Sequence, residues 1–168
     1  MNAGKVMEAQ WRKSALHIPK IYYRRMNDGT ATFYGGGQNG VRFQQENPYD
    51  CFMYLAPTLY LIELKSHKGT SLPISAIRKI QLKHLSSVQG TPGIEAGFVV
   101  HFPDKEECWF ADGWKVKAFV DSTERKSIPL KWFQENGVRV EIIPLMKRVE
   151  YNVKGLIDSL AERRKVDR

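Results

Sequence analysis

The sequence predicts an α/β fold in which helices flank a mixed central β-sheet. The chain has 168 residues, which is enough for one domain with a hydrophobic core. Segment 58–66, TLYLIELKS, is apolar almost without interruption as far as Ile62, as is typical of a central strand. Segments with apolar residues at helical spacing both precede and follow the strand-like segments. Together these observations favour one sheet covered by helices.

In the first half of the chain, an amphipathic helix comes before the strands. Its apolar residues recur at helical spacing, and Pro19 ends it. The strand segments are rich in β-favouring residues, and a short turn at Pro57 joins the last two. We expect a helix over 3–16, strands over 20–25, 49–56 and 58–66, and a second helix over 74–88.

In the second half, the turn PDK separates two further strands, and Gly137 closes a short helix. The final segment, AERRKVDR (161–168), is expected to be a solvated basic tail, with DNA contact as the alternative. The predicted elements are strands over 95–102 and 106–112, helices over 113–122 and 128–137, a strand over 138–145 and a helix over 152–166.

A long connection rich in Gly, Asn and Gln links two of the strand segments, over residues 27–48. Connections of this length in a small domain are either functional or without fixed structure. Arg42 and Phe43 lie at or near its tip. Composition alone leaves both interpretations open.

The charge balance concerns partners rather than fold. The chain carries 26 Lys and Arg against 18 Asp and Glu, a net charge of +8, which favours a polyanion such as nucleic acid. The alternative is a merely basic protein. No apolar run approaches the roughly 20 residues of a membrane helix, and no signal-peptide core is present, so we expect a cytoplasmic location. Cys51 and Cys108 lie in apolar segments and are expected to be buried reduced thiols.

Three charged residues mark the ends of two neighbouring strands. Asp50 begins one strand, and Glu63 and Lys65 end the next. If the strands pair as a hairpin, residues at its open end face each other about 5 Å apart. Glu63 and Lys65 are two residues apart and therefore point to the same face of a strand. The three side chains are thus expected to converge.

Two converging carboxylates require a counter-charge. At about 4 Å they repel by roughly 4 kcal/mol at an effective dielectric constant near 20. Lys65 offsets part of this repulsion, and Mg²⁺ or Mn²⁺, which prefer oxygen ligands, would offset the rest. A cation there could act on a phosphoryl group. The alternative is an ordinary Glu–Lys pair on an exposed strand face.

These residues, with two later stretches, resemble a known family. The spacing D-x12-ELK, followed by SLPISAIRKIQLKHL and later by RKSIPLKWF, is similar to the RecU-type Holliday junction resolvases of the PD-(D/E)xK nuclease superfamily. The resemblance runs from GKVMEAQW to about Tyr151. It implies one nuclease domain over 1–168 with a restriction-endonuclease-like core, in which residues 28–48 form a projecting stalk. Cellular members often carry a basic extension before the first helix, and its lack here suggests a minimal version such as a phage would encode.

The resemblance assigns roles residue by residue. Asp50, Glu63 and the carbonyl of Leu64 would bind Mg²⁺ or Mn²⁺, and Lys65 would be the catalytic lysine. Gln81 would face the site from the following helix; the alternative is an ordinary solvated helix residue.

Glu8, in the pattern GKxxE on the first helix, would reach the site from behind, or would be a plain surface acid. On the stalk, Arg42 and Phe43 would contact the junction. Other basic groups beside the site would contact phosphates, although each one could instead be merely solvated. These are His67, Lys68, Arg78, Lys79 and Lys83. The remaining histidines, His17, His84 and His101, are expected to be structural or on the surface.

The function expected is a metal-dependent homodimeric endonuclease that makes paired, symmetric nicks in four-way DNA junctions during recombination or repair, in contact with recombination proteins. Two alternatives stay open. One is another PD-(D/E)xK nuclease, restriction-like or acting in repair, and the other is a junction-binding protein without catalysis.

Overall fold

The computed structural model describes residues 3–26 and 47–166. The first half contains α1 (Ala3–Leu16), β1 (Tyr22–Arg25), β2 (Cys51–Leu55), β3 (Thr58–Ser66), β4 (Ser71–Pro73), the 3₁₀ turn η1 (Ile74–Ala76) and α2 (Lys79–Ser87). The second half contains β5 (Ile94–Phe102), η2 (Pro103–Lys105), β6 (Glu107–Asp112), α3 (Gly113–Ser122), β7 (Ser127–Pro129), α4 (Leu130–Asn136), β8 (Val138–Arg139), β9 (Ile142–Pro144), β10 (Val149–Tyr151) and α5 (Val153–Val166).

A six-stranded sheet forms the centre of the described structure, in the order β1-β2-β3-β5-β6-β8. Strands β3 and β5 are parallel, and the other neighbouring pairs are antiparallel. The parallel pair is connected through α2, as a crossover between parallel strands requires. The predicted fold class, a mixed central sheet flanked by helices, is therefore confirmed.

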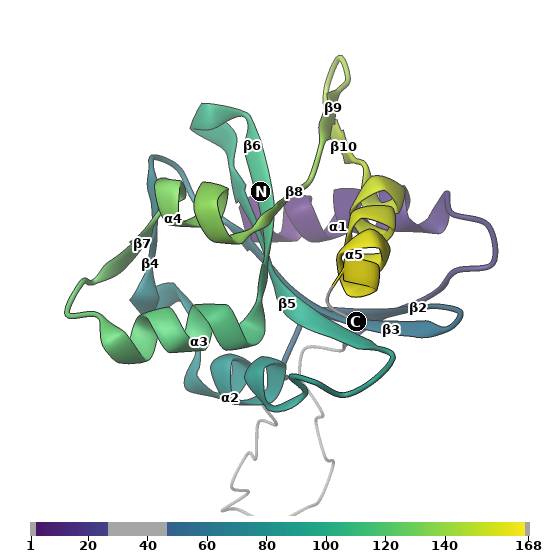
Figure 1. The fold of residues 1–168 in the computed structure, drawn as a ribbon. Helices are drawn as coiled ribbons and strands as arrows, with labels where there is room; N and C mark the ends of the chain where they lie inside the picture. The colour runs from purple at the N-terminus through teal and green to yellow at the C-terminus, as the bar shows by residue number, and fades with distance from the viewer. Residues whose placement is uncertain (1–2, 27–46, 167–168) are drawn as a thin grey trace, which may run out of the picture.

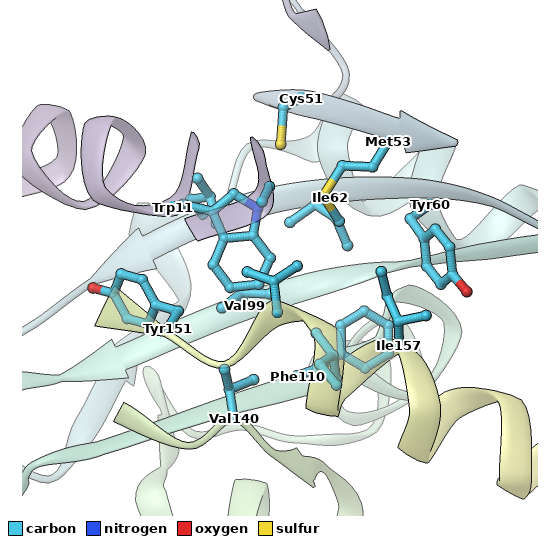
Figure 2. Packing of buried hydrophobic residues seen from close by; sticks show 14 of the residues in the cluster. Trp11, Cys51, Met53, Tyr60, Ile62, Val99, Phe110, Val140, Tyr151 and Ile157 are labelled. Atoms are coloured by element: carbon cyan, nitrogen blue, oxygen red, sulfur yellow. The ribbon is translucent and has the colours of Figure 1, made fainter. Parts of the chain in front are cut away.

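Two hydrophobic clusters fill the two faces of this sheet. On one face, α1 and α5 pack over a cluster that includes Trp11, Val99 and Ile157 (Figure 2). On the other face, residues of α2, α3 and α4 pack around Phe98 and Phe133. Figure 1 shows α2 and α3 on the opposite side of the sheet from α1 and α5. Each residue of β3 therefore has a helix layer to face.

Alternation along β3 decides which residues reach which layer. Tyr60, Ile62 and Leu64 point into the α1/α5 cluster, whereas Leu61 belongs to the α2/α3/α4 cluster. Successive side chains of a strand point to opposite faces. Glu63 therefore lies on the same face as Leu61, toward α2.

The helix expected over 74–88 begins later than predicted. Residues Ile74–Ala76 form a 3₁₀ turn, and α2 starts only at Lys79. Ile77 and Arg78 between them are extended, with ψ angles of 118° and 145°, which no α-helix accommodates. Ile77 is 6% exposed, so the extended bend serves to bury its side chain before the helix begins.

The strand expected over 138–145 is two strands. Val140 and Glu141 separate β8 from β9. Val140 is 1% exposed, and its N–H donates to the carbonyl of Cys108. After this point the chain leaves the main sheet, and β9 pairs with β10 as a hairpin. The short strands β4, β7 and β10 were not predicted. Cys51 and Cys108 are both free and buried, as expected.

The basic end of the chain is not simply a solvated tail. Arg163, on α5, makes ion pairs with Glu95 at 3.1 Å and with Asp112 at 2.7 Å. Arg164 pairs with Glu95 at 3.3 Å. Both carboxylates are almost fully buried, so these arginines attach the last turns of α5 to the sheet. Among the described basic residues of this segment, Lys165 matches the expectation, since it is 71% exposed.

Candidate active site

The β2–β3 hairpin brings Asp50 and Glu63 together at its open end. Cys51 pairs with Ile62 in the ladder, and the backbone N–H of Asp50 donates to the Ile62 carbonyl at 3.1 Å. This register sets Asp50 opposite Glu63, just before the first residue of β2. The carboxylate of Asp50 turns back to accept the Leu64 N–H at 2.8 Å. The sequence-based expectation of proximity therefore agrees with the observed register.

The two oxygens of Glu63 have different surroundings. Oε1 accepts from Lys65 Nζ at 2.8 Å and from Gln81 Nε2 at 2.5 Å. Oε2 is buried and has no hydrogen-bond partner within residues 3–26 and 47–166. The Glu63 side chain is only 2% exposed, so water does not readily replace the missing partner. A buried carboxylate oxygen without a partner is costly, and such groups are typically completed by an ion or an ordered water.

The start of α2 determines how Gln81 is oriented. Gln81 is the third residue of the helix, and its Oε1 accepts the N–H of Arg78, the N-cap residue, at 2.9 Å. Because the carbonyl end is engaged there, the amide NH₂ is directed at Glu63. Gln81 is fully buried, so this orientation has no competition from solvent. The expectation that Gln81 faces the site from the second helix agrees with this geometry.

Electrostatics in the site disfavour two ionised carboxyls. Burial, and then the charge of Asp50, raises the pKa of Glu63 to about 7, although Lys65 opposes the shift. Burial also raises the pKa of Asp50, and the hydrogen bond from Leu64 opposes this. Both groups would regain their ordinary acidity if positive charge were added between them. The site thus has an electrostatic demand for a cation.

The donor set fits a hard divalent cation. It offers the partnerless Glu63 Oε2, the Asp50 carboxylate and the backbone carbonyl of Leu64. A strand residue directs its N–H and C=O to the same side. The Leu64 carbonyl therefore points toward Asp50, as the Leu64 N–H does. Asp50 directly precedes Cys51, the first residue of β2. In the part of the chain that is described, no three or more His, Cys, Asp or Glu side chains gather as a metal site. Any cation here would need backbone, water or substrate oxygens as well.

Glu8 lies on the far side of the sheet from this group. It belongs to α1 and pairs with Arg25 at 2.8 Å, with 21% of its side chain exposed. Its negative charge still contributes to raising the pKa of Asp50. Glu8 therefore lies behind the site, as the family resemblance implies, but its carboxylate is engaged in an ion pair with Arg25.

The basic residues expected near the site are spread over two elements. Lys79 and Lys83 lie on the exposed side of α2, and Lys68 is exposed after β3. Arg78 donates from Nη2 to the carbonyl of Asn47 at 3.3 Å, and its charge lowers the pKa of both site carboxyls. Of these four residues, Arg78 is the one whose charge is shown to reach the site carboxyls.

His67 follows Lys65 at the end of β3. Its backbone N–H donates to the carbonyl of His101, and its Nδ1 is buried and has no partner in the described part of the chain. His101 contacts the Tyr151 hydroxyl at 3.0 Å and so has the structural role expected for it, while His17 and His84 are exposed. Arg42 and Phe43, with the rest of 27–46, lie outside the described residues.

Comparison of the sequence with known protein families identifies the family of this chain. RecU, described as Recombination protein U, matches residues 53–153, more than half of the chain. The chain belongs to the RecU family. The matched region contains Glu63, Lys65 and Gln81, and the RecU-type resemblance stated from the sequence motifs is confirmed.

Individual relatives of this RecU family member extend the comparison. The SPbeta prophage-derived uncharacterized protein YotM of Bacillus subtilis is 29% identical over 89% of this chain and 81% of its own length. The Holliday junction resolvase RecU of Lactococcus lactis subsp. cremoris (strain SK11) is 31% identical over 46% of this chain, but the matched region is only 36% of that protein. A solved structure of the Holliday junction resolvase Hjc of Archaeoglobus fulgidus covers 80% of this chain and 90% of its own, at 16% identity and a TM-score of 0.45. Within the described residues, no helix is long and apolar enough to cross a membrane.

Proposed function

We propose that this RecU family member is a divalent-cation-dependent endonuclease that resolves four-way DNA junctions. The observation that carries the proposal is the buried Glu63 carboxylate. One of its oxygens accepts from Lys65 and Gln81, while the other has no hydrogen-bond partner among the described residues. The charge of Asp50 acts on the same carboxyl and raises its pKa. Relatives named Holliday junction resolvases supply the substrate class. The net charge of +8 suits a polyanionic substrate.

In this proposal, Asp50, Glu63 Oε2 and the Leu64 carbonyl hold Mg²⁺ or Mn²⁺. The bound cation would withdraw charge from the scissile phosphoryl group and acidify the attacking water. Lys65, 17% exposed, keeps a positive charge at the edge of the site, where it can orient that water and offset the charge that develops on the phosphate. Gln81 keeps Glu63 Oε1 engaged, so that Oε2 remains available.

Hydrolysis proceeds by in-line attack of water on phosphorus. The P–O3′ bond breaks, leaving a 5′-phosphate and a 3′-hydroxyl. Cleavage of two opposed strands is best served by two identical sites related by a two-fold axis, which is why we propose a homodimer. Junction preference would come from shape and spacing rather than from reading bases.

Contacts with the rest of the junction fall to the basic groups around the site and to the stalk proposed for 28–48. Each phosphate contact of this kind adds affinity without adding sequence preference. The residues proposed for DNA contact are Arg42, Phe43, His67, Lys68, Arg78, Lys79 and Lys83.

The first experiment compares cleavage of an end-labelled four-way junction and of a matched linear duplex with Mg²⁺. Native protein is expected to nick the junction at symmetric positions and to leave the duplex intact. Glu63→Gln should bind the junction without cutting it. The matched control is Glu162→Gln, which changes an acid that is 70% exposed on α5 and should cleave like the native protein.

The other outcomes have distinct meanings. Equal cleavage of junction and duplex would indicate a general nuclease. Junction binding without cleavage by the native protein would leave a binding protein and refute the mechanism. Titration calorimetry with Mn²⁺ tests the site separately, because Asp50→Asn should abolish binding that the native protein shows.

A further inference from the structure

The sheet face that carries the candidate site continues beyond it as a row of aromatic residues. Along β2, alternate residues share a face, so Asp50 is followed on the same side by Phe52 and Tyr54. In the ladder with β1, Tyr54 pairs with Tyr22, and Phe52 pairs with Arg24. Cross-strand partners point to the same face. We call Tyr22, Arg24, Phe52 and Tyr54 the aromatic platform.

These rings are unusually exposed for a sheet face next to a hydrophobic core. Tyr22 is 52% exposed and Tyr54 is 45% exposed. The rings of Tyr22 and Phe52 are 6.0 Å apart and tilted by 40°, so they already contact each other. Phe52 also packs against the α2/α3/α4 cluster, which holds the platform in a fixed position. The result is a rigid surface of ring faces and edges that is open to a ligand.

Arg24 adds a positive charge to the platform. It is exposed, and it makes no ion pair or side-chain hydrogen bond with the rest of the described chain. Its neighbour Arg25 points to the opposite face and pairs with Glu8. In the ladder Arg24 lies opposite Phe52, two residues along the strand from Asp50. Arg24 is therefore a diagonal cross-strand neighbour of Asp50, and such neighbours are about 7–8 Å apart. Among the residues that the structure describes, this cation beside the site therefore has no counter-ion.

We propose that the aromatic platform binds an unpaired stretch of the DNA strand that is cut in the candidate site. Bases from an opened branch point would stack on Tyr22 and Tyr54, while Arg24 would contact a phosphate next to the scissile one. Tyr54 is four residues from Asp50, about 13 Å along the strand, which is within the reach of a few nucleotides. Aromatic faces interleaved with cations are how proteins bind single strands without reading sequence. This inference rests on the proposed nuclease function and names the part of the substrate that it recognises.

A second copy of the chain is the competing occupant of an exposed sheet face. The charge argues against it, because a two-fold contact through the platform would bring uncompensated Arg24 residues of two basic chains toward each other. Continuity favours nucleic acid, since the row of residues runs directly into Asp50 on the same strand face.

The test places 5-iododeoxyuridine at the branch point of a four-way junction and maps photocrosslinks on the Glu63→Gln protein, which should bind without cutting. Crosslinks are expected at Tyr22 or Tyr54. Tyr22→Ala should weaken junction binding roughly fivefold to a hundredfold, whereas Tyr22→Phe, which keeps the ring, should bind normally. Arg24→Gln should reduce the slope of log affinity against log salt concentration by about one.

Crosslinks elsewhere, together with unchanged affinity in Tyr22→Ala, would overturn the proposal. A fall from dimer to monomer mass in sedimentation of Tyr22→Ala would assign the face to a second copy instead. If Tyr22→Ala does not fold, Arg24→Gln alone decides through its salt slope. If the native protein never cuts DNA but the platform variants lose junction binding, the platform proposal is supported and the nuclease proposal is refuted. If the platform variants bind and cut the junction like the native protein, the nuclease proposal is supported and the platform proposal is refuted.

Discussion

Replacing Arg163 by methionine should strongly destabilise the fold. The guanidinium contacts Asp112 through two hydrogen bonds, at 2.8 and 2.7 Å, and Glu95 through a third, at 3.1 Å. Both acid side chains are 8% exposed, so the two charges have almost no access to water. Methionine keeps much of the side-chain volume and removes only the charge and its donors.

The loss of unfolding free energy depends on which cations remain beside the two buried acids after the substitution. Removing one partner of a buried ion pair costs about 3–5 kcal/mol, because the other charge stays buried. Here Arg164 remains 3.3 Å from Glu95, and Lys115 remains 3.4 Å from Asp112, so each acid retains one cation. We therefore expect the lower end, about 3 kcal/mol of unfolding free energy at pH 7.

Urea unfolding followed by circular dichroism measures this. With an m-value of about 2 kcal/mol/M, the midpoint should fall by about 1.5 M. Lys165→Met is the matched control, because Lys165 is 71% exposed and pairs with the exposed Glu162. It should change stability by less than about 0.5 kcal/mol. An Arg163→Met midpoint equal to that of the control would refute the view that this cluster anchors α5.

Three further changes test other parts of the structure. Gln81→Leu should weaken Mn²⁺ binding and slow cleavage about 10- to 100-fold, because the support of Glu63 Oε1 is lost; native-like calorimetry and rates would contradict this. Burial lowers the pKa of His101, so the folded state binds fewer protons there than the unfolded state, and stability is lost as pH falls through about 6.5. The unfolding free energy of His101→Gln should therefore fall less steeply between pH 7 and 5 than that of the native protein, and equal slopes would refute the assignment. Gly97→Ala should cost about 1–3 kcal/mol in urea unfolding, since its Cβ would lie 2.2 Å from the Ala111 carbonyl oxygen; an unchanged midpoint would show that the sheet yields there.

Local patterns in the sequence were enough to predict the candidate carboxylates. Asp50 and Glu63 end adjacent strands joined by a tight turn, and a two-residue turn leaves little freedom of register. Lys65 follows from the two-residue repeat of a strand. The bond between Lys65 and Glu63 is thus a consequence of local structure.

The orientation of the Gln81 side chain could not be predicted from local sequence patterns. A helix starting at 74 would turn Gln81 to a different position relative to its N-cap, and the observed start after Arg78 makes it the third helical residue. That start depends on the burial of Ile77 against the second hydrophobic cluster. The orientation of the amide toward Glu63 is therefore a tertiary effect.

The sequence by itself determined the fold class, most helices and strands, the charge that favours nucleic acid, and the hairpin that carries the carboxylates. Those features depend on periodicity and on contacts between neighbours in the chain. Only the tertiary structure decided that Arg163 is an anchor rather than part of a solvated tail, that β4 pairs with β7, and that Arg24 lies on the face of the site. These depend on residues far apart in sequence, whose meeting is decided by how the helices cover the two faces of the sheet.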